Sequence, residues 1–102
     1  MIWIYIDDER TIDGPDEIVR DYKSAIAAID MYYSMVSDKT NVIVVDFDHD
    51  LGEERSGYDV AKYIVENQLS TNRIVFKLHT MNPIGRFNIK QLLTHYGYQE
   101  IV

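Results

Sequence analysis

The feature that most constrains the fold is a set of short, continuous apolar runs that alternate with segments of helical periodicity. Three runs rich in β-branched and aromatic residues cover residues 2–6, 42–48 and 73–79. Such runs are typical of strands buried on both faces of a parallel sheet. Apolar residues at helical spacing predict helices over 24–36, 58–69 and 86–97. We expect Ser24 to cap the first helix and Gly97 to follow the last.

Two shorter segments complete the predicted order of elements. Residues 17–22 are expected to form a strand, although they could also begin a helix, and residues 98–102 are expected to form an edge strand. Residues 37–41 predict a loop. The order β-β-α-β-α-β-α-β predicts an α/β fold with a mostly parallel sheet of about five strands in the flavodoxin-like order 2-1-3-4-5. We expect three layers, with helices on both faces of the sheet and no helix in the first crossover.

Length and composition limit the classes of function. The 102 residues suffice for a single domain, 1–102, with one core. A net charge of −7 argues against a general nucleic-acid-binding surface, and the lack of cysteine excludes disulfides and zinc–thiolate sites. We find no signal-peptide pattern and no run of membrane-spanning length, so we expect a soluble, cytoplasmic protein without a membrane partner.

Polar residues gather where three of the predicted strands end. They are Asp7, Asp8, Glu9 and Arg10 after the first run, Asp48, His49 and Asp50 after the second, and His79 and Thr80 after the third. Ligands of open α/β sheets bind at the carboxyl ends of the strands, beside the point where the strand order reverses. Each cluster alone would be an ordinary solvated strand end, but all three are expected on one rim of one sheet.

Carboxylates from neighbouring strands repel each other unless they share a proton or a cation. Asp7, Asp8, Asp48 and Asp50 are therefore candidate ligands of Mg²⁺, which prefers oxygen ligands, or of another divalent cation. The alternative is that Arg10 and Arg86 neutralise the cluster.

Two histidines are expected on adjacent strand ends, His49 and His79. Such a pair could divide the roles of general acid and general base across a phosphoryl centre. His95 lies inside a predicted helix, where a structural role is expected.

The stretch "HTMNPIGRFN", residues 79–88, predicts a phosphate-binding turn. Pro83 restrains Asn82 to an extended backbone, and Gly85 permits a close approach of the backbone. Arg86 is expected near the start of the last helix, where free backbone N–H groups attract anions. An ordinary loop with a helix cap is the alternative.

Four segments together carry a resemblance to a known family. "IDDER", "DFDHDLG", "SGYDVAKYI" and "HTMNPIGRFN" occur in the order found in the cyclic-phosphate-processing receiver-like domains, a reduced branch of the response-regulator receivers. The resemblance spans nearly the whole chain. It implies a role in processing cyclic phosphates of nucleotides or nucleotide-derived molecules, with a site at Asp7, Asp8, Asp48, His49, Asp50, His79, Asn82 and Arg86.

This chain departs from the family and from ordinary receivers at a few positions. Asp46 stands where the family has a small or hydroxyl residue, and Thr80-Met81 replaces a more usual Ser-Ala pair. Receivers carry a lysine after their fifth strand, and no lysine follows residues 98–102 here. This difference argues against ordinary phospho-relay signalling and leaves the receiver-like fold intact.

Two functions follow as hypotheses. The first is a phosphoesterase in which His49, His79 and Asp48 are catalytic, and Arg10, Thr80, Asn82, Gly85 and Arg86 bind the substrate phosphate. The alternative is a non-catalytic receiver-like module that binds a phosphorylated or cyclic nucleotide, or a protein partner. An acidic decoy for DNA-binding proteins is a weaker third idea. A homodimer through Trp3, Tyr32 or Tyr58 stays open.

Overall fold

The computed structural model describes residues 1–35 and 41–102 and contains a five-stranded, fully parallel sheet with three helices. The sheet order is β2-β1-β3-β4-β5, so the predicted fold class and strand order are confirmed. In chain order the elements are β1 (Ile2–Ile6), β2 (Glu17–Val19), α1 (Tyr22–Met35), β3 (Ile43–Phe47), α2 (Gly57–Glu66), β4 (Ile74–Leu78), α3 (Pro83–His95) and β5 (Gln99–Glu100). Of the loop predicted at 37–41, only residue 41 lies within the described residues, and residue 36 of the first predicted helix lies outside them.

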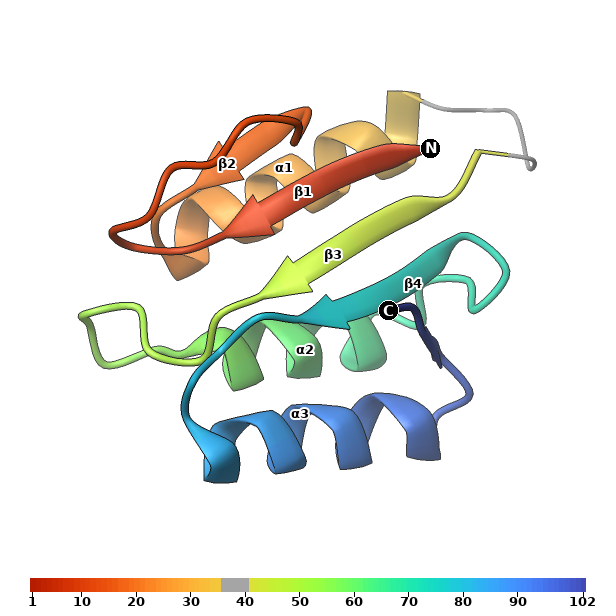
Figure 1. Cartoon of the computed structure of the whole chain (residues 1–102). Helices are drawn as coiled ribbons and strands as arrows, with labels where there is room; N and C mark the ends of the chain where they lie inside the picture. Colours follow the sequence, from red (N-terminus) through yellow and green to blue (C-terminus); the bar gives the residue numbers. More distant parts are fainter. Residues whose placement is uncertain (36–40) are drawn as a thin grey trace.

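The three helices lie on one face of the sheet, which corrects the prediction of three layers (Figure 1). The connections from β2 to β3, from β3 to β4 and from β4 to β5 all run in the same direction across the sheet. Because such connections are nearly always right-handed, helices on these three crossovers pack on the same face. The connection from β1 to β2 runs the other way and carries no helix in the described chain. The molecule therefore has two layers.

The hydrophobic core lies between the sheet and this helix layer. Strand residues such as Ile4, Val45 and Phe76 are fully buried and belong to a single cluster with residues of all three helices, including Ile29, Ile64, Ile89 and Leu93. Alternate strand residues point to the opposite face. Two of them, Tyr5 and Val44, are buried but lie outside this cluster.

The helix-free face is closed locally by the N-terminal loop and by Trp3. A Cβ placed on Gly14 would lie 2.9 Å from the Trp3 ring, so the loop crosses directly over the indole. The Lys77 ammonium lies 5.8 Å from the centre of the same ring. Beneath this cover, Asp46 is only 1% exposed although no described helix packs above it.

The helix starts differ from the predictions because side-chain caps decide them. α1 begins at Tyr22, and its cap is Asp21, whose carboxylate accepts the Ser24 N–H at 2.8 Å; Ser24 is thus inside the helix. α3 begins at Pro83 rather than at residue 86, with Asn82 as its cap. Proline suits the first turn because the N–H it lacks has no partner within the helix.

The two edge strands are shorter than predicted, whereas the end of the last helix agrees with the prediction. β2 ends at Val19 and β5 covers only Gln99–Glu100, because both strands lie at the edges of the sheet. Gly97 follows α3 with φ +91°, as the sequence predicts for a residue that ends a helix. No helix in the described ranges is long and apolar enough to span a membrane.

Candidate functional site: a carboxylate–histidine centre

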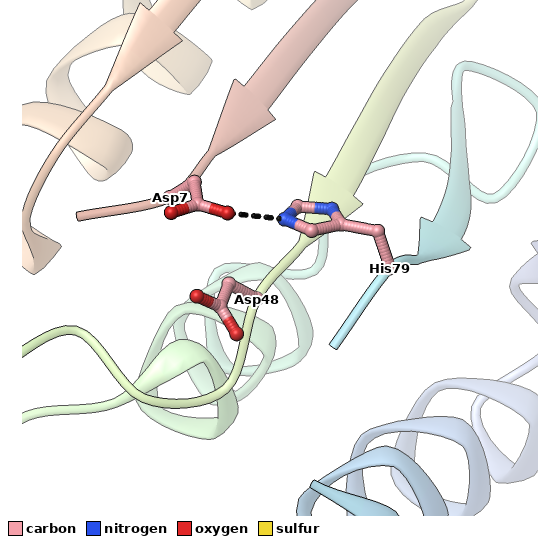
Figure 2. Close-up of side chains that lie close together, drawn as sticks. All are labelled: Asp7, Asp48 and His79. Atoms are coloured by element: carbon pink, nitrogen blue, oxygen red, sulfur yellow. Dashed lines mark hydrogen bonds and ion pairs between the residues drawn. The ribbon is translucent and has the colours of Figure 1, made fainter. Parts of the chain in front are cut away.

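Asp7, Asp48 and His79 meet at the carboxyl edge of the sheet (Figure 2). They directly follow β1, β3 and β4, three neighbouring strands. One potential ligand atom from each lies within 4.8 Å of the other two. Within the described residues, no other group of three or more acidic or histidine side chains brings its ligand atoms this close together. We call these three residues the carboxylate–histidine centre.

The His79 ring is held on both of its nitrogens. Nδ1 lies 2.8 Å from a carboxylate oxygen of Asp46, and Nε2 lies 3.1 Å from Oδ2 of Asp7. The ring of Tyr5 stacks on the imidazole with 4.2 Å between centroids and 10° between planes. His79 therefore has one defined orientation, with Nε2 toward the centre and Nδ1 toward the helix-free face.

The two carboxylates of the centre have opposite electrostatic environments. Burial acts to raise the pKa of Asp7, but N–H donors from Arg10 and Glu9, the His79 ring and the Arg10 charge outweigh it and hold this pKa below its ordinary value. For Asp48, burial and the nearby Asp7 charge raise the pKa, against hydrogen bonds from the His49 amide and the Thr80 hydroxyl. Asp7 is thus a stable anion, whereas the negative charge on Asp48 is disfavoured without a compensating cation.

Arg10 lies at the edge of the centre and belongs to the loop that shapes Asp7. Its Nε is 3.1 Å from Oδ2 of Asp7, and about half of its side chain is exposed. Asp7 Oδ1 accepts the backbone N–H groups of Glu9 and Arg10 at 2.9 and 2.8 Å. Arg20 ties this loop to β2 by donating to the carbonyls of Asp7 and Arg10 at 3.1 and 2.6 Å.

His49 lies beside the centre, in a different environment from His79. Its Nδ1 is 3.3 Å from Oδ1 of Asp50, and the Asn82 amide is 3.5 Å away. Its ring packs against Gly85, where a Cβ would overlap with the imidazole. In the described part of the chain, Nε2 of His49 has no hydrogen-bond partner. Of the two histidines at this edge, His49 is thus the one with a free ring nitrogen.

The predicted phosphate-binding turn is built differently from the expectation. The Asn82 side chain accepts the N–H groups of Ile84 and Gly85 at 3.1 and 3.0 Å, and the Arg86 amide donates to the Asn82 carbonyl. These first amides of α3 are therefore already paired within the turn. The exposed Arg86 side chain donates through one nitrogen to the carbonyl of Leu78 at 3.0 Å.

The remaining predicted site residues divide between the centre and its surroundings. Thr80 is 5% exposed, and its hydroxyl forms a hydrogen bond with the Asp48 carboxylate, so it helps to hold a residue of the centre. Asp8 and Asp50 are not members of it. The Asp8 carboxylate lies over Gly52, and Asp50 is 70% exposed beside His49.

Sequence reasoning missed the residues on the helix-free face that hold the site. The sequence gives no role for Asp46, it indicates only strands for Tyr5 and Arg20, and it indicates a strand and a candidate dimer contact for Trp3. The available signal was the alternation of β3, which places Asp46 on the same face as Asp48. Their contacts depend on the register that pairs Tyr5 with Asp46 across β1 and β3.

Comparison with known families agrees with this fold. The family model of the cyclic-phosphate processing receiver domain matches residues 2–95. This chain belongs to that family. The match spans β1 through α3 of this receiver domain and so includes all three residues of the centre. Comparisons with curated proteins and with solved structures found no match.

The donor set of this receiver domain fits a divalent cation. Two carboxylates and an imidazole nitrogen suffice to hold one, with waters or substrate oxygens as the further ligands. The ligand set contains His79 and lacks Asp8 and Asp50, which the sequence predicts as ligands. An imidazole ligand suits Mn²⁺ or Zn²⁺ better than Mg²⁺, which prefers oxygen.

Proposed function

We propose that this receiver domain is a hydrolase that opens a cyclic phosphate of a nucleotide or a nucleotide-derived small molecule. The observation that carries the proposal is the carboxylate–histidine centre at the carboxyl edge, in a chain whose family is described as cyclic-phosphate processing. The environment of the centre suits a divalent cation because Asp48 needs a compensating positive charge, and the bound cation would in turn attract the phosphate of the substrate.

A divalent cation at Asp7, Asp48 and His79 would supply that charge and would polarise a phosphoryl oxygen of the substrate. The chain's own residues then hold the cation and keep Asp7 ionised through the two backbone N–H groups that it accepts. Arg10 and Arg86 are the cationic side chains that we propose for the outer phosphate oxygens. Both are exposed; Arg10 lies in the loop after β1, and Arg86 lies in the first turn of α3.

We assign the acid and base steps to His49 and not to a pair of histidines. Asp50 near Nδ1 favours the tautomer with the proton on Nδ1, which leaves Nε2 as the base. His49 takes a proton from water, the water oxygen forms a bond to phosphorus, and one ring P–O ester bond breaks. His49 then returns the proton to the leaving alkoxide, and the product is a phosphomonoester with a free hydroxyl group.

A pocket near this edge suits the rest of a nucleotide. It has a volume of about 560 Å³ and is lined by Tyr22, Lys23, Ile26, Glu53, Glu54 and Arg55. The Arg55 guanidinium lies 4.4 Å from the centre of the Tyr22 ring. Tyr22 starts the helix after β2, and Arg55 lies in the loop after β3. We propose that the base of the substrate stacks here.

The test is a panel of 2′,3′- and 3′,5′-cyclic nucleotides incubated with the protein and followed by phosphorus NMR. Parallel samples contain EDTA, Mg²⁺ or Mn²⁺. We expect a monoester resonance to appear with Mn²⁺ for at least one class of substrate and to be absent with EDTA. Unchanged cyclic phosphate across the whole panel and all metals would reject the hydrolase.

A second candidate is the non-catalytic module that binds a cyclic or phosphorylated nucleotide. It is favoured by the hydrogen bonding at this edge. Both ring nitrogens of His79 and the first backbone amides of α3 already have partners within the chain, so they are not free for a substrate. Equilibrium dialysis followed by denaturation distinguishes the two. Recovery of intact ligand supports binding alone, and recovery of an opened monoester supports the hydrolase.

Other properties stay predictions from the sequence. They are the cytoplasmic location, the lack of a general nucleic-acid surface and of a membrane partner, and the homodimer. Of the residues considered for a dimer, Tyr32 and Tyr58 are half-buried and pack against the core, and Trp3 is half-buried on the helix-free face.

A further inference from the structure

Asp46 is a buried carboxylate that the proposed hydrolysis does not use directly. It lies on the helix-free face of β3, is 1% exposed, and contacts two side chains from neighbouring strands. The indole N–H of Trp3 donates to its Oδ2 at 3.0 Å, and its Oδ1 lies 2.8 Å from Nδ1 of His79. A buried carboxylate is costly, so its place here calls for a role.

We propose that Asp46, oriented by Trp3, is a positioning residue that keeps a proton on Nδ1 of His79 and thereby presents the Nε2 lone pair to the cation held with Asp7 and Asp48. The inference rests on the proposed function in one respect, since it requires a divalent cation at the centre. The tautomer of His79 is testable without the cation.

The direction of the hydrogen bonds carries the proposal. The indole nitrogen of Trp3 is only a donor, so Oδ2 of Asp46 must be an acceptor. A carboxylate that accepts from Trp3 also accepts from Nδ1–H of His79. The ring also faces a second carboxylate through Nε2, 3.1 Å from Asp7, and this longer contact is the one that a cation held with Asp7 and Asp48 would replace. The shorter contact of 2.8 Å with Asp46 is then left to hold the Nδ1 proton.

The orientation of the ring completes the arrangement. Tyr5 stacks on His79 and belongs to β1, the strand that also carries Trp3 and that pairs with β3, which carries Asp46. With Nδ1 on the helix-free face, Nε2 lies at the carboxyl edge, 3.1 Å from Asp7. Metal-binding histidines commonly donate their second N–H to a carboxylate, and loss of that carboxylate weakens metal binding by about 10–100-fold.

The decisive variant is Asp46→Asn, because Trp3 controls how an amide would sit. The Trp3 N–H holds the amide oxygen, so the amide NH₂ group faces Nδ1 of His79 and donates to it. The ring proton then moves to Nε2, which can no longer bind a cation. In the double variant Trp3→Phe/Asp46→Asn the amide is free to turn, its oxygen faces His79, and the original tautomer returns.

Asp30→Asn is the matched control. Asp30 also accepts a hydrogen bond from an aromatic side chain, the Tyr63 hydroxyl at 2.6 Å, but it lies in the helix layer. Thermal unfolding of all variants without metal shows whether each is folded under the conditions of the binding experiments.

Two measurements test the proposal: Mn²⁺ titration by calorimetry, and ¹⁵N NMR of the His79 ring in the metal-free protein. We expect Asp46→Asn to bind Mn²⁺ about 10–100-fold more weakly and to lose the proton on Nδ1 of His79. The double variant should recover part of both, and Asp30→Asn should change neither. Unchanged affinity in folded Asp46→Asn would overturn the positioning role, as would an unprotonated Nδ1 in the wild type.

The two proposals fail differently. If the wild type does not bind Mn²⁺, the cation-dependent function is rejected together with the role of Nε2 as a ligand. If Mn²⁺ binds and hydrolysis is absent, the proposed function fails while the role of Asp46 is still decided by affinity and NMR.

Discussion

At the scale of single residues, the two candidate histidines have different surroundings. Both nitrogens of His79 face carboxylates, whereas Nε2 of His49 has no partner among the residues that the structure describes. The strand ends alone predicted the two as an acid–base pair, because each directly follows a strand. The difference arises from Asp46, which only the packing of β3 against β4 brings to His79.

Replacing His49 with alanine should slow cyclic-phosphate opening by about 10²–10⁴-fold, because the proton-transfer group is lost. Binding of Mn²⁺ should be nearly unchanged, because His49 is not part of the carboxylate–histidine centre. Steady-state kinetics and metal titration of the same preparation measure both effects. His95→Ala, on the exposed side of α3, is the control and should retain full activity; full activity in His49→Ala would reject this role.

At the scale of elements, the first residues of the helices position the side chains around the site. The sequence predicts the caps of these helices only in part. Asn82 before Pro83 is a recognisable cap, but the preference for an extended residue before proline suggested a longer loop. For α1, Ser24 and Asp21 are both good cap residues, and their reciprocal hydrogen bonds make Asp21 the cap. Sequence boundaries of helices are decided by such local competition between neighbouring caps.

Removing the cap of α1 by Asp21→Ala should lower the free energy of unfolding by about 1 kcal/mol at neutral pH. Hydrogen bonds from the Ser24 amide and hydroxyl hold the pKa of Asp21 below its ordinary value. The contribution of the charged cap is therefore present above the unfolded pKa of 3.8 and is lost as the pH falls through the lower folded pKa.

Urea unfolding of both proteins at pH 7 and near pH 2.5 measures this difference. The gap in stability should shrink at the lower pH, because protonation weakens the cap in the wild type. A gap that is the same at both pH values would contradict the role of the ionised Asp21.

Gly85→Ala tests how α3 supports His49. A Cβ in this helix favours helix formation by up to about 1 kcal/mol, but here it would overlap with the His49 ring. The overlap includes the His49 Cβ at 2.7 Å, which no rotation of the ring can relieve, so the free energy of unfolding should fall by about 1–3 kcal/mol. Turnover should fall on the order of 10²-fold because the base is displaced.

Gly57→Ala is the contrasting variant for the same pair of measurements, urea unfolding and turnover. Its Cβ would overlap with the backbone carbonyl of Asp48, which cannot rotate away, so stability should fall by more than in Gly85→Ala. Wild-type turnover in Gly85→Ala would contradict the close packing of His49 on α3.

At the scale of the whole molecule, a sheet with helices on one face leaves its other face to short loops and aromatic side chains. Trp3 and Tyr5 cover Asp46 and His79 there, on the same strands whose opposite side chains form the core. Because both faces share these strands, the site and the core are expected to unfold together.

The single tryptophan makes this testable. Fluorescence of Trp3 reports on the helix-free face, and far-ultraviolet circular dichroism reports mainly on the three helices. Their urea midpoints should coincide within error in the metal-free protein. An earlier fluorescence transition would show that the helix-free face opens independently, and the positioning of His79 would then be less rigid than the structure implies.

The sequence by itself determined the alternating strands and helices, the strand order and the carboxyl edge that carries the polar residues. These follow from local periodicity and from residues that directly succeed each strand. Tertiary structure decided that all three helices cover one face, because this depends on the direction of each crossover. It also decided the partners of His79, because contacts of Asp46, Trp3 and Tyr5 depend on register, and a shift by one residue would turn each of them to the other face.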